Sequence, residues 1–277
     1  MGRYERPPDL AQALALMSDG NLTPLAGGTD FYPARVGKPL DDDVLDLSRV
    51  ATLRGIADEG EHWRLGGLTT WTDLIEAELP PLFDGYKAAA REVGGVQIQN
   101  AGTLAGNLCN ASPAADSTPC LMALNAVVEL QSARTLRRAP VSRFVRGNRQ
   151  TERQGDEIVT ALLVPKPKHR ARSAFLKLGA RKYLVISIVM IAVVIEDADG
   201  AVADARVAVG SCSAVPQRLI ALEAALNGKP IRPALADLVR PNHLSSLTPI
   251  SDVRATAAYR NDAAVELARR ALYKITR

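Results

Sequence analysis

Two segments rich in glycine and other small residues constrain this chain more than any other feature. The first reads LAGGTD at residues 25–30, and the second reads NAGTLAGNLCNASPAAD at residues 100–116. Neither segment offers many side chains that could fill a core. Glycine allows a positive φ and lets another group approach the backbone where a Cβ would otherwise stand. Successive small residues can also point several N–H groups into one concavity, which suits phosphate oxygens.

Together the two segments predict a ligand with two phosphates. Residues 26–29 form the expected first concavity, and Asp30 is expected to accept backbone N–H bonds and fix the loop. Residues 103–107 offer backbone donors, a hydroxyl and a side-chain amide, and Asp116 can accept from a sugar hydroxyl. Because a dinucleotide needs more donors than one turn supplies, we expect the two segments to converge on one such molecule.

An ordinary turn is the alternative interpretation of a lone Gly-Gly pair. Neither segment matches GxGxxG or GxxxxGK[ST], so the sequence does not support a Rossmann site or a P-loop. The spacing of the small residues by itself therefore predicts only a pair of phosphate-binding segments.

Composition excludes several other classes of protein. The chain has 277 residues, of which 47% are hydrophobic, as in ordinary globular proteins with a sizeable core. Its net charge of +4 is scattered and its aromatic content is only 4%, so stacking on nucleic acid has little support. The longest apolar run, at 184–195, is shorter than the roughly 20 residues that a membrane span needs.

Cysteine and histidine do not form a recognisable site. The three cysteines include no CxxC pair, and the three histidines are dispersed, so we expect neither a metal site nor a catalytic triad in this chain. An odd number of unpaired cysteines and an N-terminus without an apolar leader predict a reducing, cytoplasmic location.

Periodicity predicts a mixed α+β order. Asp9 is expected to cap a first helix that ends at Gly20. A proline-rich basic stretch at 165–171 is expected to separate two domains. The other expected elements are strands at 23–25, 44–47, 52–58, 62–67, 127–132, 156–165 and within 184–196, a return strand within 201–213, and helices within 73–79, 82–94, 116–126, 217–228 and 262–275.

Six stretches in order carry a family resemblance over nearly the whole chain. They are LAGGTDFYPARVGK, GGVQIQNAGTLAGNLCNASPAADSTPCLMALNA, DEIVTALLVPKP, SAFLKLGARKYLVISIVMIAVV, VAVGSCSAVPQR and SDVRATAAYR. In these stretches the chain resembles the FAD-binding medium subunit of the molybdenum hydroxylases, which include xanthine, aldehyde, nicotinate and carbon monoxide dehydrogenases.

The resemblance implies a fold and a cofactor. The fold is α+β: a two-part FAD-binding domain of the vanillyl-alcohol-oxidase (PCMH) type over residues 1–170, with subdomains 1–57 and 58–170. A smaller α+β C-terminal domain of the carbon monoxide dehydrogenase flavoprotein type follows at 171–277.

The resemblance also assigns site residues. The two glycine-rich segments hold the FAD pyrophosphate, Asp116 contacts the ribityl or ribose, Ile158 packs beside the isoalloxazine, and Lys177 lies near the flavin edge. An ordinary core strand residue is the alternative for Ile158, and a surface strand charge is the alternative for Lys177. The implied cofactor-binding residues are Leu25, Ala26, Gly27, Gly28, Thr29, Asp30, Thr103, Leu104, Ala105, Gly106, Asn107, Asp116, Ile158 and Lys177.

The chain departs from the family pattern at two positions. Gln99 stands where a basic residue is usual, and Ala105 stands where glycine is commoner. Ala105 therefore puts a positive φ or a very close ligand approach at that position in doubt, although Gly106 remains.

The implied function is electron transfer through FAD, with no catalytic and no metal residue on this chain. The molybdopterin cofactor is expected on a large partner subunit and two-iron two-sulfur clusters on a small one, in a dimer of heterotrimers. NAD, oxygen or a quinone is the external acceptor. The alternative function is a self-contained FAD-dependent oxidase or dehydrogenase, for which Tyr183 is the one candidate base.

Overall fold

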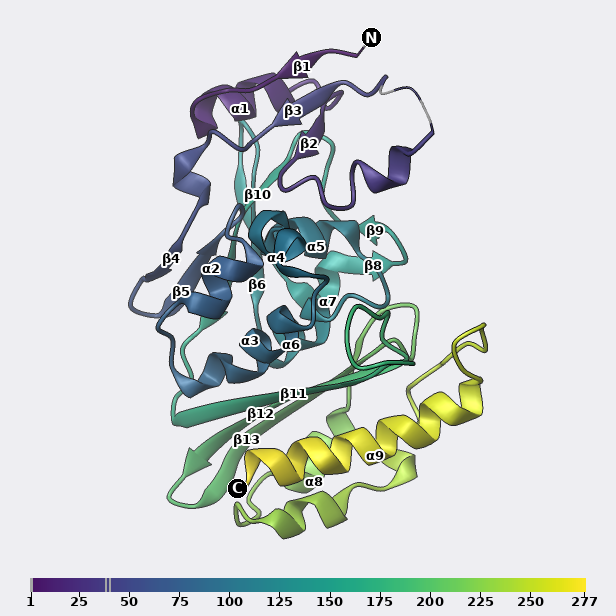
Figure 1. Cartoon of the computed structure of the whole chain (residues 1–277). Helices are drawn as coiled ribbons and strands as arrows, with labels where there is room; N and C mark the ends of the chain where they lie inside the picture. The colour runs from purple at the N-terminus through teal and green to yellow at the C-terminus, as the bar shows by residue number, and fades with distance from the viewer. Residues whose placement is uncertain (1, 38, 40) are drawn as a thin grey trace. The chain divides into compact units, whose positions relative to one another are not determined.

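The computed structural model of the chain describes residues 2–37, 39 and 41–277 (Figure 1). Contacts divide the chain into two compact units. The first contains Met1–Ala77, Val96–Ala111 and Ala126–Pro165, and the second contains Glu78–Gly95, Ser112–Asn125 and Lys166–Arg277. Two insertions of the N-terminal half thus group with the C-terminal segment, whereas the expected linear boundary at 170/171 stays a prediction.

The first unit contains two main sheets. A parallel sheet has the order β1-β3-β2, and a five-stranded antiparallel sheet has the order β4-β5-β10-β6-β7. A two-stranded ribbon, β8-β9, completes the strands. Their bounds are β1 Tyr4–Glu5, β2 Thr23–Leu25, β3 Val44–Asp46, β4 Ile56–Asp58, β5 His62–Gly66, β6 Val127–Gln131, β7 Leu136–Pro140, β8 Val145–Gly147, β9 Gln150–Thr151 and β10 Ile158–Pro165.

Short capped helices join these strands. Asp9 caps α1 by accepting from the Gln12 N–H at 2.9 Å, and Gly20 leaves the helix with a φ of 68°, as the sequence predicts. Thr70 and Asp73 form a capping box at the start of α2. The helices of this unit are α1 Leu10–Met17, α2 Trp71–Glu76, α4 Val96–Ala101, α5 Leu104–Asn110 and α7 Val141–Phe144, with 3₁₀ turns η1 Pro33–Arg35 and η2 Ala51–Leu53.

The second unit is a four-stranded antiparallel sheet with helices on both faces (Figure 1). Its order is β11-β12-β13-β14, with β11 Arg170–Leu178, β12 Val189–Ala198, β13 Ala201–Gly210 and β14 Gln217–Arg218. Odd-numbered residues of β12, such as Ile191 and Val193, join the core that α8 and α9 cover. Because β12 is buried on both faces, its sequence is a continuous apolar run rather than an alternating one.

Helices α3 and α6 lie on the opposite face of this sheet from α8 and α9 (Figure 1). Gly85 of α3 lies so close to β11 that an added Cβ would stand 2.9 Å from the Ala174 carbonyl carbon. The helices of the unit are α3 Asp84–Arg91, α6 Ser117–Ala123, α8 Ile220–Leu226 and α9 Ala257–Ile275, with 3₁₀ turns η3 Pro81–Phe83, η4 Pro233–Leu238 and η5 Pro241–Leu244.

Several element boundaries differ from the prediction: α9, for example, begins at Ala257 rather than at 262. Three of the differences have a local cause. The strand expected within 184–196 begins only at Val189, because Leu184 adopts a φ of 51° in an exposed loop. The strand expected over 52–58 covers only Ile56–Asp58, since the preceding residues form η2. The helix expected from 217 begins at Ile220, because Gln217 and Arg218 pair with β13 as β14.

No helix in the described residues combines the length and apolar character that crossing a membrane would require. Within the same residues, no cluster of three or more His, Cys, Asp or Glu side chains is arranged to hold a metal ion.

Candidate functional site

The two glycine-rich segments meet inside the first unit. A Cβ on Gly27 would lie 1.8 Å from the carbonyl oxygen of Ala101, so only glycine allows this approach. From the other side, a Cβ on Gly102 would lie 3.2 Å from Thr29 Oγ1, and one on Gly106 would lie 4.0 Å from the Ala26 Cβ. The two segments are therefore in contact, as predicted, whereas the ligand that they share stays a prediction.

The first segment presents a run of backbone donors. It follows β2, whose last residue Leu25 accepts from the Leu47 N–H at 2.9 Å. Gly28 has a φ of 72°, and its carbonyl accepts from the Tyr32 N–H at 3.2 Å. Among the described residues, the N–H groups of Gly27, Gly28 and Thr29 have no protein acceptor, although all three residues are only partly exposed. Half-buried N–H groups in series are the donor set that an anion can satisfy.

Asp30 is exposed and lies at the outer end of this segment. Its carbonyl accepts from the Ala34 N–H at 3.2 Å and so ties the segment to the turn η1. No bond from its carboxylate to a backbone N–H forms among the described residues, so the expected side-chain role in fixing the loop is wrong.

The second segment is the capped start of a helix rather than an open loop. Thr103 is 5% exposed and caps α5 by accepting from the Gly106 N–H at 3.1 Å. The Leu104 N–H donates to the Thr69 carbonyl at 2.9 Å, and the Asn107 N–H donates to the Thr103 carbonyl at 3.0 Å. Three of the expected backbone donors are thus engaged within the chain. The small residues here serve the close packing of the two segments.

Ala105 and Ile158 occupy core positions of the first unit. Ala105 is 4% exposed within α5, and its helical backbone explains why alanine replaces glycine there without strain. Ile158 begins β10, is 2% exposed, and belongs to an apolar cluster against which Ala26 packs. This is the core position that the alternative interpretation of Ile158 expects.

In the second unit the structure joins two residues that the sequence treats separately. Lys177 Nζ of β11 lies 2.7 Å from Asp116 Oδ2, at the residue preceding α6. Lys177 also donates to the Val185 carbonyl at 3.3 Å. Both side chains are 8% exposed, so the alternative interpretation of Lys177 as a surface strand charge is wrong.

Ser187 completes this buried cluster and is a residue that sequence reasoning missed. Its hydroxyl donates to Asp116 Oδ1 at 2.6 Å, and the residue is 2% exposed. Burial raises the pKa of Asp116, against the opposing effects of the Lys177 ammonium and the Ser187 hydroxyl. The one available signal was that Ser187 is the single polar residue in the apolar run at 184–195.

Burial disfavours the charged form of all three cysteine thiols. Burial raises the pKa of Cys109 to about 11 and that of Cys212 to about 12, and all three thiols are free. Since the thiolate is the reactive form, these thiols are poor nucleophiles at neutral pH.

Comparison with known proteins places the chain in a family. Residues 1–167 match the model for the FAD-binding domain in molybdopterin dehydrogenase, and residues 174–275 match that for the carbon monoxide dehydrogenase flavoprotein C-terminal domain. The nicotine 6-hydroxylase medium subunit of Paenarthrobacter nicotinovorans is 31% identical over 280 residues, which cover 98% of this chain and 95% of that protein. This chain belongs to the family of FAD-binding medium subunits of molybdenum hydroxylases.

Other members of the family agree in sequence and in fold. The xanthine dehydrogenase FAD-binding subunit of Escherichia coli O157:H7 is 31% identical over 267 residues, covering 93% of this chain and 90% of that one. The structure of reconstituted carbon monoxide dehydrogenase from Oligotropha carboxidovorans superposes with a TM-score of 0.89 at 26% identity, covering 100% of this chain and 98% of that chain. The enzyme from Hydrogenophaga pseudoflava gives 0.86 at 27%, covering 99% and 96%.

Membership settles the broad predictions. The chain has the α+β fold of this family, with an FAD-binding domain followed by a C-terminal flavoprotein domain. It is an FAD-dependent oxidoreductase subunit.

Proposed function

We propose that this chain is the electron-transfer subunit of a heterotrimeric molybdenum hydroxylase. The observation that carries the proposal is the run of half-buried N–H groups at Gly27, Gly28 and Thr29, which lies against the backbone of Gly102. An anion is the partner that such a run lacks, and the FAD pyrophosphate supplies one. The residues of the first unit therefore fit this cofactor.

The proposed binding residues divide by the part of FAD that they hold. Leu25 to Asp30 and Thr103 to Asn107 would surround the pyrophosphate, with the donors concentrated in the first of these two segments. Asp116 would accept from a sugar hydroxyl: each of its oxygens already has one partner, and a carboxylate oxygen can accept a second. Ile158 would support the flavin from the apolar cluster, and Lys177 would place its charge near the flavin edge.

When bound, FAD supplies the electron-accepting ring, and the chain's own residues fix its place and surroundings. The Asp116 carboxylate holds the Lys177 ammonium in one position by a direct hydrogen bond. Because the pair is largely withdrawn from water, its field on a neighbouring group is screened less than that of surface charges.

The rest of the assembly is proposed from the relatives. A large subunit would carry the molybdopterin cofactor and oxidise the substrate, and a small subunit would carry two-iron two-sulfur clusters that pass electrons to this chain. The nicotine 6-hydroxylase relative is a medium subunit, and the carbon monoxide dehydrogenase of Hydrogenophaga pseudoflava is an enzyme of the molybdenum cofactor, which supports partners of these kinds. We further propose a dimer of heterotrimers in the cytoplasm that delivers electrons to NAD, oxygen or a quinone.

The test is to purify the chain alone and together with its two partner subunits. The chain alone should be yellow, with about one FAD per chain by absorption and by release on denaturation, and should not oxidise small alcohols or amines. When the heterotrimer receives its substrate without oxygen, the flavin of this chain should become reduced. Removal of the small subunit should abolish that reduction. A colourless chain that ignores added FAD would contradict the proposal, and turnover by the isolated chain would instead favour a self-contained oxidase.

A further inference from the structure

Arg260 is a buried cation in the first turn of α9, in the second unit. Its residue is 3% exposed, although a guanidinium that leaves water gives up its hydration. The buried residues that follow it on the helix are apolar and belong to the core of the unit: Ala264, Leu267, Ala268, Ala271, Leu272 and Ile275. Because a buried ion pair is weak evidence for stability, the arginine at this position calls for a geometric explanation.

The Arg260 guanidinium joins three segments of the chain. Its Nη1 donates to the Ile188 carbonyl at 2.5 Å and to the Ser211 carbonyl at 3.1 Å. Its Nη2 donates to Asp252 Oδ1 at 2.8 Å. Ile188 directly precedes β12 and Ser211 directly follows β13, so the arginine fastens the start of one strand to the end of the next.

The contact with Ile188 leads to Asp116 through Ser187. The Ile188 N–H donates to the Leu178 carbonyl of β11 at 2.7 Å, and Arg260 holds the Ile188 carbonyl. The peptide units on both sides of Ile188 are therefore fixed. Ser187 is the preceding residue, and its hydroxyl donates to Asp116 Oδ1 at 2.6 Å.

The contact with Ser211 leads to Asp116 from the other side. Ser211 has a φ of 62°, in the left-handed region that residues other than glycine rarely adopt. Such a conformation persists where the surroundings fix it. Here the Ser211 carbonyl accepts from Arg260, and the Ser211 N–H donates to the Pro113 carbonyl at 3.1 Å. Pro113 lies three residues before Asp116, so this bond fixes the backbone that leads into α6.

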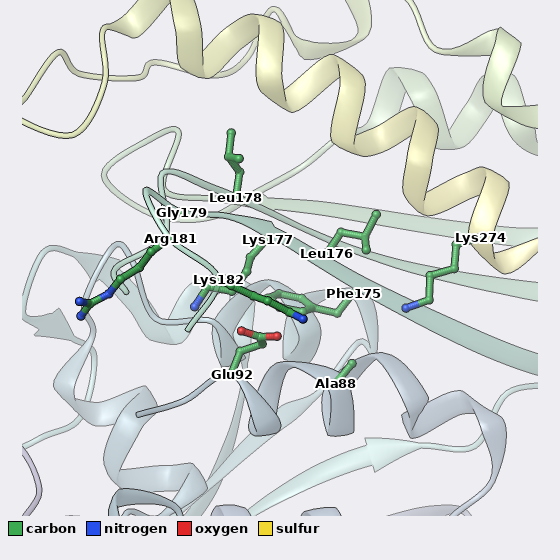
Figure 2. Close-up of a pocket in the computed structure, with 10 residues that line it drawn as sticks. All are labelled: Ala88, Glu92, Phe175, Leu176, Lys177, Leu178, Gly179, Arg181, Lys182 and Lys274. Atoms are coloured by element: carbon green, nitrogen blue, oxygen red, sulfur yellow. The ribbon is translucent and has the colours of Figure 1, made fainter. Parts of the chain in front are cut away.

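Arg260 and the Lys177 ammonium lie on opposite faces of the sheet. Figure 2 shows Lys177 and Leu178 leaving β11 on opposite sides. Leu178 packs against the core that α8 and α9 cover, so Lys177 points to the other face. Arg260 therefore affects Lys177 through the two backbone segments and Asp116, rather than by contact.

We propose that Arg260 is a positioning residue for the pair of Asp116 and Lys177. It fixes Ser187 and the backbone before α6, which together set the place of the Asp116 carboxylate, and this carboxylate holds the Lys177 ammonium at 2.7 Å. The inference rests on the proposed FAD function in one step only: the pair must lie near the flavin edge for Arg260 to influence the flavin.

The first test is hydrogen exchange of the full chain, followed by mass spectrometry on peptides that cover residues 185–188. Arg260→Met keeps a long apolar side chain but removes the donors, so exchange in this segment should be about tenfold faster than in the parent. Arg269→Met is the matched control. Arg269 belongs to the same helix and donates to the Val239 carbonyl at 3.1 Å, away from β12, so its loss should change exchange at 185–188 by no more than about twofold.

A second variant covers the case in which Arg260→Met does not fold. Arg260→Lys keeps the charge beside Asp252, but an ammonium cannot reproduce the planar fork that reaches two carbonyls and a carboxylate. Exchange at 185–188 should then be about threefold faster than in the parent. Parent-like exchange in every Arg260 variant that folds would overturn the proposal.

The second test is the midpoint potential of FAD bound to the full chain. Lys177→Met should lower the potential, because a nearby cation favours the anionic reduced flavin. Arg260→Met should lower it by part of that shift at the same FAD content, and Arg269→Met should leave it unchanged. A purely structural role of Arg260 would speed exchange without moving the potential.

The outcomes separate this inference from the proposed function. A potential that Lys177→Met lowers and Arg260→Met leaves unchanged would overturn the inference alone. If Lys177→Met also left the potential of bound FAD unchanged, the inference and the place proposed for Lys177 would both fail, while FAD binding would stand. A chain that binds no FAD would contradict the proposed function, and exchange at 185–188 would still decide whether Arg260 fixes the Ser187 segment.

Discussion

The Lys177 ammonium lies 2.7 Å from the Asp116 carboxylate, across a sequence separation of 61 residues. Lys177 belongs to β11, an edge strand of the four-stranded sheet, and Asp116 directly precedes α6. The pair therefore fastens this helix to that strand. Both side chains are withdrawn from water, and removing either partner alone leaves a buried charge without its counterion.

The first prediction concerns this pair. Asp116→Asn should lower the free energy of unfolding by about 3 kcal/mol, because the Lys177 ammonium loses its counterion in a poorly solvated place. The double variant Asp116→Leu/Lys177→Met should recover much of that loss, since no charge then remains buried. Urea denaturation of the three proteins measures the effect. Equal loss in the single and double variants would show that the ion pair is not what stabilises this junction.

A second prediction uses the approach of the two glycine-rich segments. Gly27→Ala places a methyl group 1.8 Å from the Ala101 carbonyl oxygen, so the segments must separate. We expect a loss of at least about 2 kcal/mol in stability and a fall in FAD content per chain. Absorption of the purified protein after dialysis against FAD gives the content.

Gly155→Ala is the matched control for this substitution. Gly155 is in the same unit, and the nearest atom to its added Cβ is the Gly20 carbonyl oxygen at an ordinary 3.5 Å. The control should keep its FAD and change stability by no more than about 0.5 kcal/mol. Retention of full FAD by Gly27→Ala would mean that the segments need not touch for the cofactor to bind.

Local sequence patterns predicted most of the helices and strands in which buried residues recur at regular spacing. The β12 run shows where this stops. Residues 184–188 are as apolar as the strand that follows, but Leu184 has a positive φ and is 58% exposed, so hydrophobicity alone could not place the strand's start. A strand buried on both faces carries no alternation to fix its ends.

The candidate site was predictable only in part, for a related reason. The glycines at 27 and 102 pointed to a close approach, because no other residue fits there. Helix α5 was missed because it is only seven residues long and includes one Gly and two Asn, which weaken its helical propensity. Its start also depends on Thr69, which is remote in sequence. The pairing of Asp116 with Lys177 and Ser187 is set by the tertiary fold, and no local pattern encodes it.

A third prediction tests the cap of α5. Thr103→Val keeps the side-chain shape but removes the oxygen that accepts from the Gly106 N–H at 3.1 Å. Stability should fall by about 1 kcal/mol, the usual cost of losing an N-cap, whereas Thr103→Ser should behave like the parent. Thermal unfolding with and without added FAD measures both. If the valine variant kept the stability of the parent, the hydrogen bond from the Gly106 N–H would not be what stabilises the start of α5.

The last prediction is a dependence on pH that arises at the β7 hairpin of the first unit. Arg137 bonds Glu152 at 2.7 Å and Glu157 at 2.6 Å. The Arg137 guanidinium lowers the pKa of Glu152 below its ordinary 4.5. The pKa of Glu157 is also lowered, because its bonds to Arg137 and to the Gln154 N–H outweigh the opposing effect of burial. Both carboxyls therefore bind protons more weakly in the folded state than in the unfolded one.

A lowered pKa fixes the sign of this dependence. The stabilisation is fully present above the ordinary glutamate pKa and is lost as the pH falls through the lower, folded-state pKa values. Arg137→Gln should lower stability at pH 7 by about 2 kcal/mol and flatten the decline in urea midpoint on the acid side of 4.5. Arg134 contacts Asp156 but stays 80% exposed. Arg134→Gln should therefore change neither the stability at pH 7 nor the acid-side decline. An acid-side slope in Arg137→Gln equal to that of the parent would show that other carboxyls govern acid unfolding.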